Sequence, residues 1–327
     1  MNPTPIRNLS DKDPIQERIF LVKDKVLGVG KTGKTFLTLL IGDQTGQLDG
    51  RIWDNIEELQ SKFEIGDLIR VKGLVQVYNQ RKQVIIHRLE KVDDLSLNKD
   101  DFKIKEKQID THALYSELFQ FVQEIEVLPL KQLMQDTLQD EEVKTRLLRA
   151  PAAKSIHHAH RGGLLEHIVS ICKVMKFIAS HYSYLNRDLL IFGAIFHDLG
   201  KIWELDFNEQ QQIFYTPSGQ LLGHMLLSCE LIEKKSRTIL GFPDDLRMIL
   251  KHIVLSHHGK QEYGSPKVPM FPEAMVVAMI DDFDSKMDTM MGFVNQERMS
   301  GESWSRFHEG FDRYFYLEDL KKKWIVE

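Results

Sequence analysis

Histidine is concentrated in one stretch of the sequence, and aspartates accompany it there. The chain has 13 His, of which ten fall between His157 and His258. His197 and Asp198 are adjacent, directly after the apolar segment IFGAIF and directly before Leu-Gly-Lys. Burying an ionised carboxylate at the end of an apolar segment is costly unless a cation lies beside it. A divalent metal bound by this carboxylate and by neutral imidazoles would meet that requirement.

Further potential metal ligands occur at or near the ends of other predicted helices. They are His167 in GGLLEH, His224 in GHMLLS, His257 and His258 in SHHG, and Asp281 in MIDDFD. A single histidine in a helix is more often a surface or satisfied core residue than a ligand. That explanation is weaker for an adjacent His-Asp pair when further His and Asp lie at or near the ends of several other predicted helices. The pattern predicts a metal site without naming the reaction.

The segments that carry these side chains have helical periodicity, which extends from about residue 112 to the end. Apolar residues recur at helical spacing in segments such as HALYSELFQFVQEI, LKQLMQDTL and DLLIFGAIFHDLG. We therefore expect an all-α domain over residues 112–327. Cys172 and Cys229 both lie in apolar helical stretches. This favours reduced, buried thiols over a disulfide framework or a cysteine zinc site.

Residues 15–93 have the pattern of β-strands instead. Strands are predicted for RIFLVKDKVLGV, TFLTLLIGD and QLDGRIWD, a short helix for DNIEELQSKFEIG, and strands for DLIRVKGLVQVY and KQVIIHRLEKV. In that helix Ile56, Leu59 and Phe63 share one face. Three strands, a short helix and two strands is the order of a five-stranded OB-fold barrel, which commonly binds oligonucleotides.

The composition is that of an ordinary globular protein, with 327 residues, 42% hydrophobic, 28% charged and a net charge of −5. It excludes wholesale disorder and collagen-like repetition. We predict an N-terminal extension (1–14), the barrel (15–93), a charged linker (94–111) and the helical domain (112–327). The barrel segment holds 13 basic against 11 acidic residues, a local net charge of +2. Because the N-terminus is polar and no apolar run could span a bilayer, we expect a cytoplasmic protein.

The candidate ligands resemble the H…HD…D signature of the HD-domain metal-dependent phosphohydrolases. His167, His197-Asp198 and Asp281 occupy that signature, and the additional His224 and His257-His258 resemble the members that hold two metals. The family pattern has a small or apolar residue, then Asp, then x-x-Asp. Ile280-Asp281-Asp282-Phe283-Asp284 fits it with Asp281 as the ligand, and the adjacent Asp282 stays an alternative.

An OB-fold followed by an HD domain is similar to the YhaM-type 3′–5′ exoribonucleases, over about residues 15–320. The resemblance implies metal-dependent hydrolysis of single-stranded RNA from the 3′ end to nucleoside 5′-monophosphates, with single-stranded DNA as a further candidate substrate. It implies Mn²⁺, with one or two ions per site, and the His-rich, Cys-free set of ligands also suits Co²⁺, Fe²⁺ or Ni²⁺. His167, His197, Asp198 and Asp281 would hold one ion. A second would bind His224, His257 and His258, with Asp198 bridging and orienting the attacking hydroxide.

Several cations near the predicted metal site could contact the substrate. Lys201, in HDLGK, could place its ammonium on the scissile phosphate, although a solvated lysine at a helix end explains its position equally well. A run before His167 could contact the 3′-terminal nucleotide, or could be an ordinary polar loop. It consists of Lys154, His157, His158 and Arg161.

The barrel offers aromatic and basic side chains that could bind a nucleic-acid strand. They are Lys31, Lys34, Phe36, Arg51, Trp53, Tyr78 and Arg81. Base stacking on aromatic side chains is worth about 1–3 kcal/mol per base and tolerates any sequence. Aromatic residues in such strands are, however, more often barrel core, so we expect about half of these residues to be contacts.

Two other interpretations remain open. The HD site could instead hydrolyse a nucleotide or a cyclic nucleotide, although such a substrate needs no oligonucleotide-binding barrel. Alternatively, the chain could be a nucleic-acid-binding protein with a vestigial HD site, although every expected ligand position holds a competent residue. The aromatic C-terminal segment SWSRFHEGFDRYFYLEDLKKKW is expected to be a helix docked on the helical domain, with an RNA path as the alternative.

Overall fold

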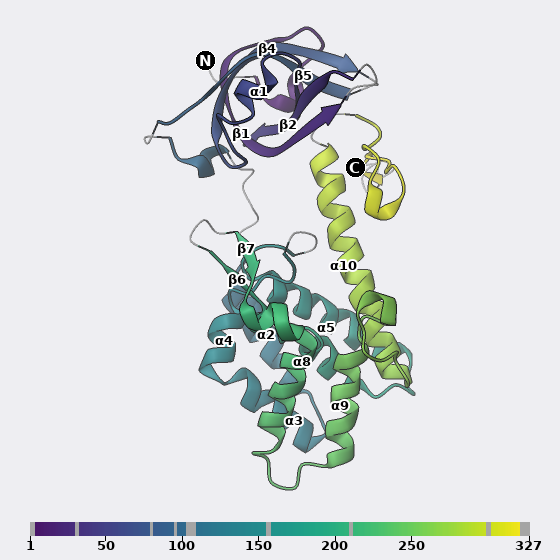
Figure 1. The fold of residues 1–327 in the computed structure, drawn as a ribbon. Coiled ribbons are helices and arrows are strands. Elements are labelled where there is room, and N and C mark those ends of the chain that lie inside the picture. Colours follow the sequence, from purple (N-terminus) through teal and green to yellow (C-terminus); the bar gives the residue numbers. More distant parts are fainter. Residues whose placement is uncertain are drawn as a thin grey trace. The chain divides into compact units, whose positions relative to one another are not determined.

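The structure is a computed structural model of the chain, and it divides into two compact units (Figure 1). The first unit contains Met1–Lys107 and Met291–Glu327, and the second contains Gln108–Met290. The residues that the structure describes are 4–29, 33–78, 81–94, 97–102, 109–154, 158–208, 212–298 and 302–320.

The first unit contains a closed five-stranded barrel, which confirms the OB-fold expectation. Its strands are β1 (Pro14–Val29), β2 (Thr35–Asp43), β3 (Gly46–Ile52), β4 (Leu68–Tyr78) and β5 (Arg81–Lys91). They are paired in the order β1-β2-β3-β5-β4 around the barrel. All pairs are antiparallel except β3 with β5. Leu37, Leu39 and Ile41 alternate along β2 and are buried in the barrel core, as the period of two requires.

The helix between β3 and β4 is shorter than its sequence pattern predicts. Only α1 (Ile56–Leu59) is helical, although Ile56 and Phe63 are buried and Leu59 packs against the barrel core. Lys25 explains the early end, because its Nζ donates to the backbone carbonyls of Gln60, at 3.0 Å, and Phe63, at 2.6 Å. Because these carbonyls accept from the lysine, they are not directed along a helix axis toward amides of a following helical turn.

Segments outside the strands complete the first unit. In the N-terminal extension, η1 (Ile6–Asn8) is a short 3₁₀ helix, and Ile6 and Leu9 are buried in the barrel core. Another 3₁₀ turn, η2 (Lys99–Phe102), lies in the expected linker.

The prediction of a C-terminal helix was wrong. Within 302–320 the described residues form isolated β-bridges, Trp304 with Tyr316 and His308 with Arg313, around the single turn η4 (Glu309–Phe311). Asp312, at φ 53°, reverses the chain in the left-handed region, which ends a helix. This segment also belongs to the unit of the barrel, whereas docking on the helical domain was expected.

The second unit is a helical bundle around one apolar core. Its elements are α2 (Thr111–Gln123), α3 (Leu128–Leu138), α4 (Glu141–Leu147), α5 (Gly163–His181), α6 (Arg187–Phe196), α7 (Lys201–Glu204), α8 (Pro217–Ser236), α9 (Asp244–Ser256), η3 (Gln261–Tyr263) and most of α10 (Pro272–Arg298). A two-stranded hairpin, β6 (Leu205–Phe207) with β7 (Ile213–Tyr215), was not predicted, because three-residue strands carry too little periodicity. Across the described ranges, no helix is long and apolar enough to cross a membrane.

Helix α6 lies at the centre of this bundle and determines where the His-Asp pair is placed. Leu190 and every residue from Ile191 to Phe196 are buried. Gly193 allows the close approach of neighbouring helices, because a Cβ atom at this position would lie 2.3 Å from a methyl carbon of Val277 in α10. Helix α6 ends at Phe196, so His197 and Asp198, which follow it directly, are surrounded by the apolar core.

Candidate metal centre

His197 and Asp198 lie at the C-terminal end of α6 and are fully buried, with 0% and 1% of their surface exposed. The imidazole of His197 is oriented by the backbone of its own helix. Its Nδ1 lies 3.0 Å from the carbonyl oxygen of Gly193 and 3.1 Å from that of Ala194. Because a carbonyl only accepts, Nδ1 carries the proton, and the lone pair of Nε2 is directed away from the helix.

A first group of four donors surrounds this Nε2, and we call it the four-donor group. It consists of His167, His197, Asp198 and Asp281, whose candidate ligand atoms all lie within 4.8 Å of one another. His167, on α5, has its Nδ1 2.8 Å from a carboxylate oxygen of Asp284, which places the proton on Nδ1. The Nε2 atoms of His167 and His197 therefore present two lone pairs to each other across 3.3 Å. Such an arrangement requires a positive charge between them.

The carboxylates of the four-donor group add negative charge to the same point. Asp281 Oδ1 lies 3.2 Å from His167 Nε2 and 3.5 Å from His197 Nε2. Burial lowers the pKa of His197, but the charges of Asp198 and Asp281 outweigh it and raise the pKa to about 10. Although burial opposes ionisation, nearby cationic groups hold the pKa values of both carboxyls well below their usual range. The group thus binds a proton or a metal cation.

Asp281 rather than Asp282 faces the group. The Asp282 carboxylate is 59% exposed and pairs with Lys286, whose Nζ lies 2.6 Å away, one turn along α10. Asp281 is only 14% exposed. The two residues are adjacent on one helix, so the rotation of α10 against α5 and α6 selects one of them.

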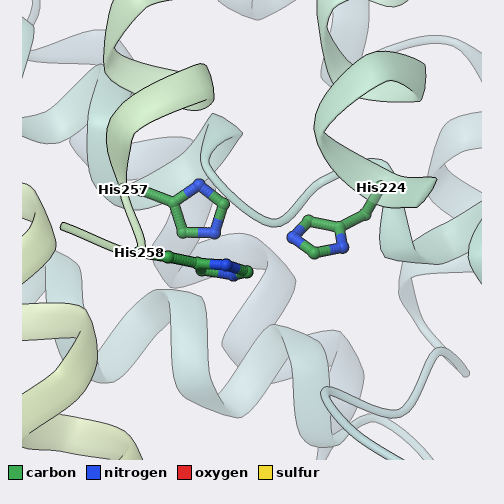
Figure 2. A group of neighbouring side chains, drawn as sticks. All are labelled: His224, His257 and His258. Carbon is green, nitrogen blue, oxygen red and sulfur yellow. The ribbon is translucent and has the colours of Figure 1, made fainter. Parts of the chain in front are cut away.

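A second group consists of His224, His257 and His258, and we call it the three-histidine group (Figure 2). The rings of His257 and His258 have centroids 4.2 Å apart, and the His224 ring lies 5.4 Å from each. His257 Nδ1 donates to the carbonyl of Val254 at 2.6 Å, and His258 Nδ1 donates to that of Tyr263 at 2.9 Å. Burial lowers the pKa values of His257 and His258, which favours the neutral imidazoles that a metal requires.

Asp198 joins the two groups. Its Oδ2 lies 3.5 Å from His197 Nε2 in the four-donor group. Its Oδ1 lies 3.4 Å from the Nε2 atoms of both His224 and His257 in the three-histidine group. One carboxylate therefore presents one oxygen to each group, which is the geometry of a bridging ligand.

Buried atoms without partners test whether a cation fits here. Asp198 Oδ1, His224 Nε2 and His257 Nε2 are buried and have no hydrogen-bond partner in the part of the chain that the structure describes. Buried polar atoms are normally satisfied, so three orphans that face one another require an explanation. All three are acceptors, and a divalent cation is the partner that would satisfy them together. The residues present therefore fit a metal ion.

Lys201 contacts the bridging carboxylate. Its Nζ lies 2.6 Å from Asp198 Oδ2, and its side chain is 12% exposed. Burial lowers the pKa of Lys201, but the charge of Asp198 dominates and raises it, so the ammonium stays charged. It supplies one positive charge at the edge of the four-donor group.

Sequence reasoning missed the carboxylates that hold the ligand histidines. Asp284 accepts from His167 and also from Ser170 Oγ, at 2.5 Å. Glu204 accepts from His224 Nδ1 at 3.0 Å. Asp284 could have been found as the last residue of the Asp-x-x-Asp pattern, whereas nothing in the sequence marks Glu204.

The cationic run before His167 is dispersed. His158 is 7% exposed, and carboxylates of Glu166 and Asp284 lie 3.3 and 3.4 Å from its ring nitrogens. His158 thus supports Asp284, the carboxylate that holds His167, and it exposes little surface to a substrate. Lys154 and Arg161 are exposed and lie over the rings of Tyr215 and Phe207 of the hairpin, at 5.8 and 5.6 Å. His157 lies outside the described residues.

Three of the barrel candidates, Phe36, Arg51 and Trp53, form one cluster. The ring centroids of Phe36 and Trp53 are 5.1 Å apart, and the Arg51 guanidinium lies over Phe36 at 5.2 Å. Gly28 on β1 makes room for the Phe36 ring, because a Cβ there would come within 2.5 Å of it. Trp53 is 51% exposed, so it is not barrel core.

The remaining barrel candidates divide by what the structure describes. Tyr78 is 62% exposed at the end of β4, and Lys34 is exposed before β2. Lys31 and the side chain of Arg81 lie outside what the structure describes.

Comparison with known proteins identifies the family. The sequence matches the HD domain family over residues 164–286 and an OB-fold nucleic acid binding domain family over residues 20–92. The 3′-5′ exoribonuclease YhaM of Bacillus subtilis is 32% identical over 307 residues, which are 94% of this chain and 96% of that protein. The chain belongs to the YhaM family. The YhaM protein of Listeria welshimeri, also called a 3′-5′ exoribonuclease, is 32% identical over 92% of this chain and 94% of its own.

The two domain matches of this YhaM-family chain coincide with the two features described above. The HD match contains every residue of the four-donor group and of the three-histidine group. The OB-fold match runs from β1 to the end of β5. Buried His and Asp donors in an HD domain are consistent with a divalent metal.

Proposed function

We propose that this chain is a metal-dependent 3′–5′ exoribonuclease that hydrolyses single-stranded RNA to nucleoside 5′-monophosphates. The observation that carries the proposal is the bridging carboxylate of Asp198, with one oxygen toward each of two groups of metal donors. Two cations held in this way would clamp both sides of a phosphoryl transfer. The full-length relatives named 3′-5′ exoribonucleases support the direction and the substrate class.

The four-donor group and the three-histidine group would each hold one divalent ion. When bound, the ions would polarise a phosphoryl oxygen and lower the pKa of the water that attacks it. Mn²⁺ suits this mixture of imidazole and carboxylate better than Mg²⁺, which prefers oxygen ligands. Co²⁺, Fe²⁺ and Ni²⁺ suit the same donor set.

The protein's own residues perform the remaining tasks. Nδ1–H contacts with Asp284, Gly193 and Val254 orient the imidazoles of His167, His197 and His257 so that each Nε2 is directed inward. Lys201 holds a positive charge beside Asp198, where it can contact a phosphate oxygen. Water adds to phosphorus, the bond from phosphorus to the 3′ oxygen of the penultimate nucleotide breaks, and that oxygen takes a proton. The shortened strand retains a 3′-hydroxyl, and the released nucleotide carries a 5′-phosphate.

Incubation with 5′-labelled single-stranded RNA tests the activity directly. We expect stepwise shortening from the 3′ end with Mn²⁺, less with Mg²⁺, and none with chelator. A 3′-phosphorylated product would contradict the proposed bond cleavage. Unchanged RNA in all three conditions would favour a nucleic-acid-binding protein with an inactive HD site. Hydrolysis of nucleotides or cyclic nucleotides in place of RNA would favour the other alternative.

The barrel is proposed to hold the strand while the HD site cleaves it. The cluster of exposed Trp53 and half-buried Phe36, with Arg51 over the Phe36 ring, supports this role. Trp53→Ala should weaken binding of a long RNA about tenfold, since one stacking contact is lost. Cleavage of a dinucleotide should not change. Tyr184→Ala, which alters a side chain 77% exposed on the helical unit, is the matched control. Equal loss on both substrates would contradict the role of the barrel.

Three predictions accompany this function. We propose that the barrel spans residues 15–93 and that the helical domain begins at residue 112, its expected end at 327 being replaced by the unit boundary at Met290, with single-stranded DNA as a further substrate. The cytoplasmic location stays a prediction from the sequence.

A further inference from the structure

Glu204 is a buried carboxylate that the proposed metal site does not use as a ligand. It is the last residue of α7 and is 7% exposed. Leu205, the next residue, begins strand β6. An ionised carboxylate at such a depth needs compensating donors, and within the described residues both hydrogen bonds to the Glu204 side chain come from a single residue.

That residue is His224 of the three-histidine group. Glu204 Oε1 accepts from His224 Nδ1 at 3.0 Å and from the backbone N–H of His224, also at 3.0 Å. The backbone N–H is available because Gly223, at φ 75° and ψ 159°, interrupts α8 immediately before His224. An amide in a continuous helix would donate to the carbonyl four residues earlier.

Close backbone contacts hold Glu204 against α8. A Cβ atom at Gly219 would lie 2.2 Å from the carbonyl oxygen of Glu204, so only glycine permits this approach. The same carbonyl accepts from the backbone N–H of Thr216, at 2.9 Å. Gly200, at the start of α7, allows an equally close approach to the carbonyl of His224. The two helices are therefore in contact at both residues of the pair.

We propose that Glu204 is a positioning residue that holds His224 with its proton on Nδ1 and its Nε2 directed at Asp198 Oδ1. This makes the three-histidine group competent to bind a metal ion. A carboxylate on the outer nitrogen of a metal-binding imidazole sets both the tautomer and the ring orientation, and its removal lowers metal affinity about 10–100-fold. The inference rests on the proposed function, because it assigns a role within the same site.

Asp284 offers a matched comparison on the other side of the bridging carboxylate. It holds His167 of the four-donor group through Nδ1, at 2.8 Å. His257 and His258 are held by backbone carbonyls instead, and substitution of side chains cannot remove those contacts. Glu204 and Asp284 therefore allow each group to be perturbed separately, without touching a ligand.

The experiment measures binding of Co²⁺ to the full-length protein, by calorimetry and by visible absorption. The proteins are wild type, Glu204→Gln, Glu204→Ala and Asp284→Asn. The glutamine keeps an acceptor oxygen and the shape of the side chain, so it guards against misfolding of the alanine variant. Circular dichroism melting checks the fold of each protein.

We expect wild type to bind two ions per chain. Glu204→Gln should weaken one of them about tenfold and Glu204→Ala about 100-fold, with the other ion unchanged. Asp284→Asn should weaken the opposite ion. Excess metal should restore RNA hydrolysis in Glu204→Gln, because only occupancy is lost.

Two results would overturn the inference. One is unchanged affinity for both ions in folded Glu204→Gln and Glu204→Ala proteins. The other is equal weakening of both ions, because Glu204 touches His224 alone among the candidate ligands. If wild type binds no metal yet is folded, the proposed function itself fails, and this outcome is recognised from the wild-type titration alone.

Discussion

The four-donor group and the three-histidine group share one aspartate but differ in charge and burial. The four-donor group holds two carboxylates, and His167, His197 and Asp198 are almost completely buried. The three-histidine group holds only imidazoles, with Asp198 Oδ1 as its nearest ligand carboxylate, and His258 is partly exposed. Charge and low solvent access both strengthen cation binding. We therefore expect the four-donor group to bind its ion more tightly and the three-histidine group to exchange its ion more readily.

The difference indicates how the work is divided between the groups. The enclosed group resembles a structural anchor, held by helices α5, α6 and α10. The more open group depends on the break in α8 at Gly223, on the C-terminal end of α9 and on Glu204. Because His258 is partly exposed, we expect solvent and substrate to reach an ion in the three-histidine group more readily than one in the four-donor group.

Substitution of the shared ligand should have the largest effect, because it damages both groups together. Asp198→Ala should reduce hydrolysis more than about 1,000-fold, since several kcal/mol of transition-state stabilisation from both ions is lost. The fold and RNA binding should persist. Hydrolysis rates and gel-shift titrations measure these two properties. Full nuclease activity in the purified variant would rule out the metal site.

Single-group substitutions should separate the two ions. His197→Ala removes a ligand of the four-donor group, and His257→Ala removes one of the three-histidine group. We expect His257→Ala to retain one tightly bound ion per chain after dialysis, and His197→Ala to retain less. Metal analysis by mass spectrometry gives the count. If the order is reversed, the assignment of tighter binding to the enclosed group is wrong.

The smallest effect is expected from His158, which supports the four-donor group through Asp284. Burial lowers its pKa, but contacts with Asp284 and Glu166 outweigh this and raise the pKa to about 9. Its contribution to stability is therefore complete below the unfolded pKa, near 6.5, and is lost as the pH rises through about 9.

Melting temperatures of chelator-treated wild type and His158→Asn should accordingly differ most near pH 6 and converge above pH 9, roughly the window between the two pKa values. Asparagine is the suitable replacement, because residue 158 has φ 43°, which asparagine tolerates. A difference that stays constant across this range would contradict the charged imidazole.

Much of the site could be predicted from the sequence because the ligands have distinctive residue types at distinctive places. A His-Asp pair after an apolar helix, and histidines at other helix ends, are visible without coordinates. The barrel was equally accessible, since alternation along β2 reports burial on one side. The structure of the C-terminal segment could not be predicted in the same way. Its aromatic residues fit a helical pattern, but the chain reverses at Asp312 in the left-handed region and the residues on either side form β-bridges.

The sequence alone determined the chemistry available to this protein: which imidazoles and carboxylates exist, and which helical segments carry them. Only the tertiary structure decided how they are paired. Asp281 faces the site and Asp282 does not, because α10 presents one side to α5 and α6. Glu204 reaches His224 across 20 residues, and Asp284 reaches His167 across 117. Such contacts depend on how helices pack, and the periodicity of any one segment carries no information about them.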